Sequence, residues 1–549
     1  MPLPRSHRSI LALALALLGL ASPAPAKPPT LSALFPAGGQ RGQTIAVTAV
    51  GSFENWPLQG WASAPGIEVK AAEAKGQLSI TIASEVVPGL YWLRLYDGQG
   101  ATEARPFVVG TLPEVNEVEP NDDPSRPQAL DSSTITINGR LAKAGDVDGF
   151  ALRLAKGQTL VASMEANRRL GSPMDGVLQV VSPEGFVLAQ NDDDHDRDPQ
   201  IIFEAPGDGT YLVRTFAFPA KPDSAIRFAG GESFVYRLAL TTEGFLDHAF
   251  PLAVPRDAPG QVEAIGWNIP EAARVLPVLL AGAAETAWVT HPLLANSAEV
   301  RLVPHAAIAE TEPNDAAHPQ AISTPITISG RIDRPGDVDG FQFTAKKGEA
   351  LVFRIESRRL GHPLDPVLRL MDSAGKVLSE VDDSGQDRDA ELPFTPPAEG
   401  TYRLSVRDRN DQGGLRYVYR LSATPPERDF ALTLGADRFT LSPGKPLTIP
   451  VTIERKGGFA EAITISLEDP PAGLSADPVV SLMAGGDAAK KVALQVTATA
   501  DARSGPIRIC GRVGDGPARA ARAPLAGFNT AIESIWLTIP EPDRDEKTP

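Results

Sequence analysis

The chain has 549 residues, and its 68 acidic side chains outnumber its 52 basic ones, for a formal net charge of −16. This length exceeds what one hydrophobic core organises and predicts roughly three to five domains. The negative charge argues against nucleic acid as a partner, because phosphate binding needs clustered lysine and arginine. Proline (51) and glycine (49) are frequent and scattered, with short alternating apolar runs between them, which favours an all-β protein.

The N-terminus has the pattern of a signal peptide over residues 1–26. Arg5, His7 and Arg8 precede an apolar run from Ile10 to Ala21, and a small-x-small cleavage site ends at Ala26. The run is too short to span a bilayer comfortably, and no later segment has about 20 apolar residues. We therefore expect cleavage near Ala26, a mature chain without a transmembrane segment, and a secreted, periplasmic or extracellular location.

Residues 27–110 are predicted to form a small β-sandwich. Apolar and polar residues alternate over 44–47, 78–82 and 91–95, as in strands with one buried face. The pattern Leu34-Phe35-Pro36-Ala-Gly38-Gly39, followed by Pro88-Gly89-Leu-Tyr91, resembles bacterial immunoglobulin-like domains of the TIG kind.

Residues 111–245 and 306–424 are two copies of one module. Residues 135–150 and 326–341 are identical at 11 of 16 positions, and the identical residues are of many types. The predicted strands of the first copy recur in the second in the same order. Both copies are predicted to be β-sandwiches.

The other segments are read from the same alternation. Residues 246–305 are expected to form a small β domain or an insertion. Residues 428–540 are predicted to form another sandwich, similar to the immunoglobulin-like modules that follow bacterial extracellular domains. Cys510, the single cysteine, lies in an apolar alternation and is expected to be a small buried residue. Residues 541–549 are charged and expected to fray.

Each copy carries two acidic motifs, Glu-x-Glu-Pro-Asn-Asp and Gly-Asp-Val-Asp-Gly-Phe. Gathered carboxylates repel by about 1 kcal/mol or more per pair even in watery surroundings, and a hard cation removes that cost. Calcium accepts six to eight oxygen ligands from loops, whereas zinc favours His or Cys, which neither set contains. The candidate calcium ligands are Glu117, Glu119, Asn121, Asp122, Asp146 and Asp148 in the first copy, and Glu310, Glu312, Asn314, Asp315, Asp337 and Asp339 in the second.

The alternative is that these motifs are solvated turns held by local hydrogen bonds of Asn and Asp. The same choice arises at a second acidic stretch, residues 191–198, which is matched by residues 382–389. Charge runs of this kind are usually solvated surface, although Asp-rich loops can hold calcium.

The two motifs, with a closing Gly-Thr-Tyr at Gly209–Tyr211 and Gly400–Tyr402, resemble the bacterial pre-peptidase C-terminal domain. The resemblance implies a sandwich of jelly-roll form with a binding or auxiliary role. It also implies structural calcium, because in the collagen-binding members of that family the corresponding acidic residues hold calcium. The fold class expected for the whole chain is all-β, a multi-domain string of β-sandwiches.

No catalytic motif is recognisable: the chain has no Gly-x-Ser-x-Gly elbow, no His-Glu-x-x-His, no P-loop and no dinucleotide fingerprint. We expect a non-catalytic protein that adheres to an extracellular protein or polysaccharide surface, or that is a matrix or envelope component. One alternative is an accessory or remnant part of a secreted protease that lacks its catalytic domain. Another is an unrecognised hydrolase, because paired carboxylates suited to glycoside hydrolysis cannot be recognised by sequence.

Overall fold

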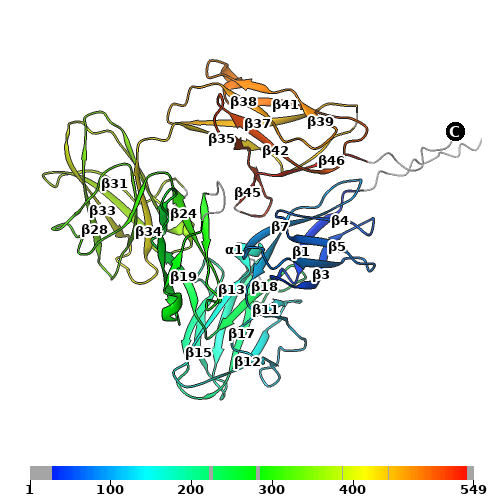
Figure 1. The fold of residues 1–549 in the computed structure, drawn as a ribbon. Coiled ribbons are helices and arrows are strands. Elements are labelled where there is room, and N and C mark those ends of the chain that lie inside the picture. The colour runs from blue at the N-terminus through cyan, green and yellow to red at the C-terminus, as the bar shows by residue number, and fades with distance from the viewer. Residues whose placement is uncertain are drawn as a thin grey trace, which may run out of the picture.

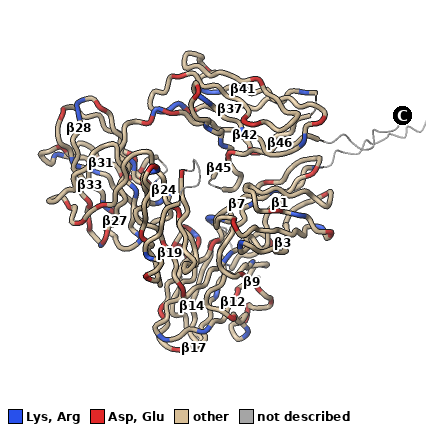
Figure 2. The backbone as a smooth tube through the Cα atoms, viewed as in Figure 1, with Lys and Arg blue, Asp and Glu red and all other residues tan. Residues whose placement is uncertain are grey.

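The structure, a computed structural model, describes residues 27–221, 227–279, 285–385, 388–442, 444–528 and 530–540. The predicted signal peptide and the tail 541–549 lie outside these residues. The regular secondary structure of the described chain is almost wholly β-strand, which confirms the all-β fold class (Figure 1). No helix in the described ranges is long and apolar enough to cross a membrane. Acidic and basic residues are interspersed over all parts of the chain (Figure 2).

The N-terminal unit is one hydrogen-bonded sheet of eight strands that folds around its own core. Val47, Ile80 and Phe107 are fully buried in this core. The short strand β2 pairs in parallel with β8 and ends the sheet. The strand order is β1 (Thr30–Phe35), β3 (Thr44–Ser52), β6 (Gln77–Ile82), β5 (Ile67–Ala71), β4 (Gln59–Ala62), β7 (Gly89–Tyr96), β8 (Arg105–Gly110) and β2 (Gly38–Gln40).

The first repeat has two five-stranded sheets with an apolar core that includes Phe150, Leu178 and Leu238. The first sheet has the order β10 (Gln128–Ala129), β12 (Asp148–Leu154), β17 (Gly209–Pro219), β14 (Met174–Val181) and β15 (Val187–Asn191). The second has the order β16 (Gln200–Glu204), β13 (Thr159–Glu165), β18 (Val235–Thr241), β11 (Ile135–Arg140) and β9 (Glu114–Asn116).

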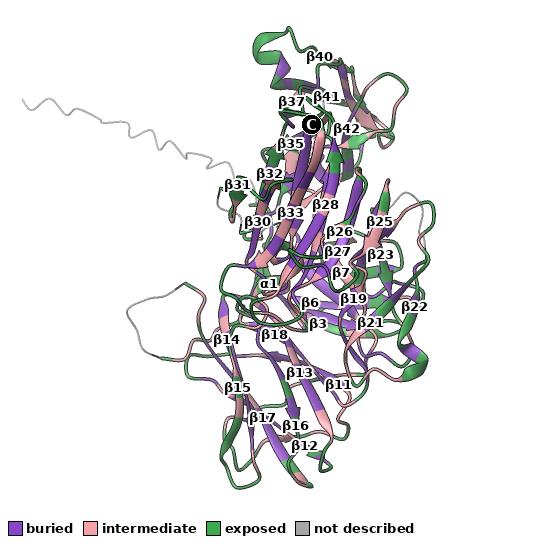
Figure 3. Cartoon of the chain, turned by 90° about the vertical axis from the view of Figure 1, so that its left-hand side faces the viewer, coloured by how far each residue is buried: buried purple, intermediate pink, exposed green. Residues whose placement is uncertain are grey.

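The second repeat has the same topology, strand for strand, and buried residues follow its strands in Figure 3. Its first sheet has the order β26 (Gln320–Ala321), β28 (Val338–Ala345), β33 (Gly400–Asp408), β30 (Pro366–Asp372) and β31 (Val377–Val381). Its second has the order β25 (Ala306–Ala309), β27 (Ile326–Arg331), β34 (Val418–Thr424), β29 (Leu351–Glu356) and β32 (Glu391–Phe394).

A short helical turn follows the corresponding strand in each repeat: α1 (Asn167–Leu170) and η2 (Arg358–Leu360). Each turn ends at a glycine with positive φ, 65° at Gly171 and 88° at Gly361, a conformation that other residues adopt only with strain. The repeated Arg-Arg-Leu-Gly sequence therefore forms the same local structure twice.

Between the repeats, residues 245–303 form a middle unit of two three-stranded sheets with a separate core that includes Val262, Leu276 and Val300. One sheet contains β19 (Phe245–Phe250), β21 (Gln261–Trp267) and β22 (Val275–Pro277). The other contains β20 (Ala253–Pro255), β24 (Ala298–Val303) and β23 (Thr286–Val289), and the turn η1 (Glu271–Ala273) follows β21.

The C-terminal unit has a core that includes Ile449, Ile465 and Leu494, and Cys510 is buried beside it as expected. One sheet has the order β35 (Asp429–Leu434), β37 (Leu447–Lys456), β41 (Lys491–Ala498) and β39 (Leu474–Ala476). The other has β36 (Arg438–Thr440), β46 (Ile535–Thr538), β42 (Gly505–Arg512), β38 (Ile463–Glu468) and β40 (Val479–Ser481), with β43 (Arg519–Ala520) paired to β42. The small elements are β44 (Ala523–Pro524), β45 (Ala531–Ile532) and η3 (Gly486–Ala489).

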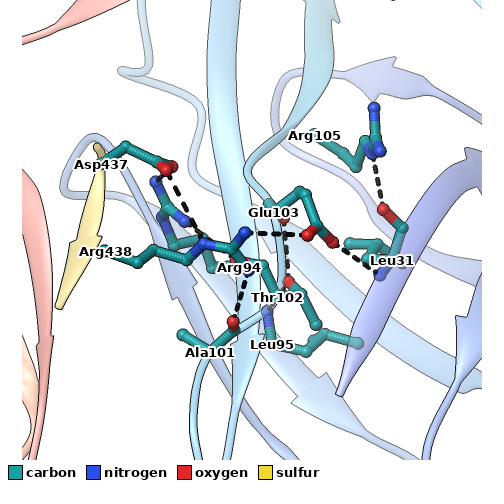
Figure 4. A network of polar contacts seen from close by, with 9 residues as sticks. All are labelled: Leu31, Arg94, Leu95, Ala101, Thr102, Glu103, Arg105, Asp437 and Arg438. Carbon is teal, nitrogen blue, oxygen red and sulfur yellow. Dashed lines mark hydrogen bonds and ion pairs between the residues drawn. The ribbon is translucent and has the colours of Figure 1, made fainter. Parts of the chain in front are cut away.

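The N-terminal and C-terminal units contact each other, so the string of units closes on itself (Figure 1). The ring of Trp536 lies 4.5 Å from that of Tyr96, between centroids. Arg94, whose side chain is 1% exposed, forms an ion pair with Asp437 (Figure 4). Arg438 Nη2 lies 2.8 Å from Glu103 Oε1 in the same network. The units thus form a circuit rather than an extended chain.

Candidate functional site

Strand pairing brings the two acidic motifs of each repeat together. In the first repeat β11 runs parallel to β9, so Glu117, just after β9, lies beside the end of β11. The Glu117 amide donates to the Asn138 carbonyl at 2.9 Å, and the Arg140 amide donates to Glu117 Oε2 at 2.8 Å. The turn that follows β11 leads to Asp146 and to Asp148, the first residue of β12. Motifs separated in sequence therefore meet at one end of the sandwich.

The first carboxylate cluster consists of Glu119, Asp122, Asp146 and Asp148. Each offers an oxygen within 4.8 Å of the others. Asp146 and Asp148 are fully buried, and Asn121 is 1% exposed. Within the described chain, Oδ1 of each of the three aspartates in the cluster (Asp122, Asp146 and Asp148) is buried without a hydrogen-bond partner. The side-chain amide nitrogen and oxygen of Asn121 also lack one. Such groups are costly to leave unmatched, so the cluster calls for a cation or for protons.

The pKa values show how this cluster resists full ionisation. Burial and the nearby charge of Asp148 raise the pKa of Glu117 to about 9. Burial also raises the pKa of Asp148 to about 7, although the Tyr236 hydroxyl donates a 2.5 Å hydrogen bond to its Oδ2. Lys143 supplies one positive charge, with Nζ 3.3 Å from Asp122 Oδ2, but its side chain is largely exposed. With a pKa of about 9, Glu117 borders the cluster as a protonated, neutral group at neutral pH.

The second repeat has two overlapping carboxylate groups that share Glu312. Glu310, Glu312 and Asp339 offer oxygens within 4.8 Å of one another, and so do Glu312, Asp333 and Asp337. Among the residues described, Oδ1 of the buried Asn314 and Oδ1 of Asp339 have no hydrogen-bond partner. The second repeat therefore presents unmatched acceptor atoms at the place that corresponds to the first cluster.

The same electrostatics operate in the second cluster. Burial raises the pKa of Glu310 to about 7, and burial together with the Glu310 charge raises that of Asp339 to about 10. The Tyr419 hydroxyl lies 2.6 Å from Asp339 Oδ2 and 3.2 Å from Glu310 Oε2. Tyr419 therefore bridges two carboxyl groups that would repel each other if both were ionised.

Asp315, a predicted ligand, lies outside the second cluster. Its exposed carboxylate accepts the backbone amides of Ala317 at 2.8 Å and His318 at 2.9 Å, so it stabilises a turn. The second repeat has one residue fewer between its buried Asn and the next strand, so Asp315 occupies the turn position that Asp123 holds in the first repeat. These hydrogen bonds favour the solvated-turn alternative for Asp315.

Asp333 is the ligand candidate that the motif analysis missed. It stands where the first repeat has Ala142, three residues before the Gly-Asp-Val-Asp motif. Asp122 in the first repeat and Asp333 in the second add a carboxylate to their clusters from different loops. A residue-by-residue alignment of the repeats shows Asp333 as an acidic substitution, and this is the signal that could have identified it.

Both clusters consist of carboxylates and one buried Asn, with no imidazole or thiol among their members. Oxygen donors on loops, in a number that can reach six or more with backbone carbonyls and water, match the preference of Ca²⁺. Zinc and copper sites are built mainly from nitrogen and sulfur ligands. The donor set therefore fits a hard divalent cation.

The other acidic stretch has a different use at its last residue. The Asp198 carboxylate accepts the backbone amides of Ala166, Asn167 and Arg168, at 3.1, 2.7 and 3.2 Å. Asp389 does the same for residues 357–359 in the second repeat, at 2.9–3.0 Å. These aspartates fix the helical turns α1 and η2. Their hydrogen bonds to the backbone amides account for their buried carboxylates without a metal.

Comparison with known families identifies the second repeat. Residues 337–408, from the Gly-Asp-Val-Asp motif to the end of β33, match the model of the bacterial pre-peptidase C-terminal domain. The chain therefore contains a domain of this family, and the resemblance seen in the sequence is confirmed for this copy. The first copy has the same topology but lies outside the match. No curated protein sequence matches the chain.

Among solved structures, the chain is similar to the pre-peptidase C-terminal domain of a Bacillus anthracis collagenase, with 19% identity, 19% of this chain and 92% of that chain covered, and a TM-score of 0.16. It is also similar to the M60 catalytic domain with two CBM51 domains of Clostridium perfringens ZmpB, at 10% identity over 71% of this chain and 54% of that one, with a TM-score of 0.14. A Bacteroides ovatus SGBP-B in complex with a mixed-linkage heptasaccharide gives 9% identity over 71% and 73%, with a TM-score of 0.14.

Proposed function

We propose that this chain is a secreted, non-catalytic protein of several β-sandwich units, in which structural calcium in the two repeats stiffens a scaffold that binds an extracellular protein or polysaccharide surface. The observation that carries the proposal is the pair of carboxylate clusters at corresponding places in the repeats. Each contains buried acceptor oxygens for which the described protein offers no donor.

In the first repeat, the ion would be held by the side-chain oxygens of Glu119, Asp122, Asp146 and Asp148 and by Asn121 Oδ1. In the second, the ligands would come from Glu310, Glu312, Asp333, Asp337, Asp339 and Asn314. A bound Ca²⁺ would offset the repulsion between ionised carboxylates and satisfy the buried oxygens. Metal binding of this kind adds its free energy to that of folding.

The position of the clusters gives calcium a mechanical role. Glu117 follows β9, and Glu310 follows β25, the strands through which each repeat is entered from the preceding unit. An ion held between this entry segment and the β11–β12 or β27–β28 turn would fix the path of the chain into the repeat. The orientation of neighbouring units would then depend on calcium, as would resistance to proteolysis.

Calorimetric titration with calcium, together with melting curves, tests the metal. The variants are Glu119→Ala with Glu312→Ala, and the matched control is Glu184→Ala with Glu349→Ala, which removes two exposed carboxylates from the same repeats. We expect heat of binding and a calcium-dependent rise in melting temperature for wild type and control. For the test variant we expect a smaller heat and a smaller rise in melting temperature. At a calcium concentration of 100 Kd, one site adds about 2.7 kcal/mol to stability. A wild-type protein without heat or a melting shift contradicts the proposal.

The surface-binding role needs a separate assay. Co-sedimentation with insoluble collagen and with insoluble polysaccharides, in calcium and in chelator, is expected to show retention that weakens when calcium is removed. The match of residues 337–408 to a domain family named for its place beside peptidases favours one alternative, an accessory part of a secreted protease. Enhanced cleavage by an added secreted protease, without retention on any surface, supports that alternative. Hydrolysis by the chain alone that survives chelation and is lost in a single carboxylate variant supports a hydrolase.

A further inference from the structure

A cluster of a different chemical kind lies where the middle unit meets both repeats. Asp247 and His248 are on β19 of the middle unit, and His362 follows η2 and Gly361 in the second repeat. Each of the three offers a ligand atom within 4.8 Å of the other two. Residues 115 positions apart in the chain, at 247 and 362, are thus brought together only by the packing of two units.

Both imidazoles are buried and have a ring nitrogen without a partner. His248 is 4% exposed and His362 is 8% exposed. Among the residues described, His248 Nε2 and His362 Nδ1 have no hydrogen-bond partner. The two rings meet edge to face, with centroids 5.3 Å apart and planes at 82°. Buried polar atoms of this kind are rare without a ligand, water or ion to satisfy them.

The neighbouring carboxylate sets the tautomer of one imidazole. His248 Nδ1 lies 2.7 Å from Asp247 Oδ2, and a carboxylate accepts this hydrogen bond only if Nδ1 carries the hydrogen. The lone pair of neutral His248 is then on Nε2, the atom without a partner. An Asp–His pair that directs a free imidazole nitrogen in this way is the arrangement that supports many protein zinc ligands.

Arg416 neutralises part of the acidic charge around this cluster. Its Nε lies 2.7 Å from Asp247 Oδ1, and its Nη1 lies 2.8 Å from Asp194 Oδ2 in the first repeat. Its Nη2 lies 2.9 Å from His195 Nε2 and donates to the Gly361 carbonyl at 3.4 Å. Arg416 therefore occupies Asp247 Oδ1, and Asp247 acts on the cluster through its hydrogen bond to His248.

The first repeat shows that the fold of the module does not require these side chains. Ser172 and Ser233 stand in the first repeat where the second has His362 and Arg416. There the Ser172 hydroxyl donates to the Ser233 carbonyl at 3.3 Å. The imidazole and the guanidinium are therefore specific to the second copy.

We propose that His248 and His362, with Asp247 orienting His248, form a binding site for a borderline divalent metal ion of the Zn²⁺ class, which joins the middle unit to the second repeat. Zinc binds imidazole nitrogen at about 2.0–2.1 Å, and two imidazoles with water in the remaining positions suit this ion. The site differs from the carboxylate clusters, because hard Ca²⁺ prefers oxygen donors.

The test is calorimetric zinc titration of the full, tag-free chain in saturating CaCl₂. Calcium then fills any carboxylate cluster that binds it, so that the zinc heat reports on the imidazole site. We expect one equivalent of zinc to bind wild type and the control His318→Gln, whose exposed imidazole lies far from the cluster in the sequence. His248→Gln and His362→Gln are expected to lose this binding, and Asp247→Asn to weaken it about 10–100-fold. Melting curves of the metal-free variants establish that each is folded.

Cobalt titration of wild type provides a second measurement that does not depend on any variant. Co²⁺ bound by the two imidazoles is expected to give visible absorption that zinc abolishes by competition. Absence of one-equivalent zinc binding to wild type overturns the proposal, and so does unchanged binding in a folded His248→Gln or His362→Gln variant. Because calcium saturates throughout, failure here leaves the calcium titration unaffected, and the reverse also holds.

Discussion

The Tyr419 hydroxyl donates a 2.6 Å hydrogen bond to Asp339 Oδ2, and Tyr236 makes the same bond to Asp148 in the first repeat. Both tyrosines are buried, and each comes from the sheet opposite its aspartate. Each ring lies across a glycine: a Cβ at Gly330 would be 2.2 Å from the Tyr419 ring. The repeated glycine thus admits a tyrosine that connects the sandwich core to the carboxylate cluster.

The first prediction concerns this bond. We expect Tyr419→Phe to lower the affinity of the second repeat for calcium, because calcium requires ionised Asp339 and the variant removes a donor to the carboxylate. Hydrogen bonds to charged groups contribute about 1.5–3 kcal/mol, so the affinity falls roughly tenfold or more. Calorimetric titration measures it. Tyr402→Phe, which removes a hydroxyl bonded to the Ala398 carbonyl, is the matched control and is expected to bind as wild type does. If Tyr419→Phe and Tyr402→Phe bind calcium with equal affinity, the hydrogen bond from Tyr419 to Asp339 does not contribute to calcium binding.

The second prediction concerns pH. The folded-state pKa values of Glu117 and Asp339, about 9 and about 10, lie above those of an unfolded chain. The folded protein therefore holds more protons than the unfolded chain between about pH 4 and pH 10, and its stability without metal falls as pH rises through this window. Melting curves in chelator at pH 5, 7 and 9 should show decreasing midpoints.

Calcium is expected to reverse this trend. Binding displaces protons from the clusters, so calcium affinity rises with pH and the calorimetric heat depends on the ionisation enthalpy of the buffer. A metal-free melting temperature that increases from pH 5 to pH 9 contradicts the raised pKa values. Heat that is the same in all buffers contradicts proton release.

The third prediction tests the closure of the circuit. Asp437→Ala leaves the buried Arg94 guanidinium without its ion-pair partner, and removal of one member of a buried pair destabilises by about 3–5 kcal/mol. We expect the interface between the N-terminal and C-terminal units to open, with a larger radius of gyration by small-angle scattering. Lys70→Ala, which removes an exposed pair with Glu68, should change stability by less than about 1 kcal/mol and leave the radius unchanged. An unaltered scattering curve for Asp437→Ala means that this ion pair does not hold the units together.

The fourth prediction separates turn stabilisation from metal binding in the second acidic stretch. Asp198→Ala removes the acceptor of three backbone amides and is expected to lower stability by roughly 1–3 kcal/mol. Exposed Asp193, in the same stretch, should be replaceable by Ala with little effect. Denaturant unfolding in calcium and in chelator compares the two. If Asp198→Ala lowers stability only in calcium, Asp198 is a metal ligand instead.

Strand positions and the repeat could be read from the sequence because both depend on local patterns. Alternating apolar residues bury one face of a strand wherever it is placed, and a duplicated motif forms the same turns twice. The carboxylate clusters were also predictable in large part, since parallel strands bring the two motifs of a repeat to one end. Asp315 differs from Asp122, because one residue fewer in the loop places its side chain in a turn.

The sequence by itself determined the all-β class, the duplication and most members of the oxygen-rich clusters. Only the tertiary structure decided that Arg94 meets Asp437 and that His248 faces His362. The physical reason is that these contacts depend on how whole units pack against one another. Such packing sums many weak contacts between residues far apart in the chain, and no short stretch of sequence carries its pattern.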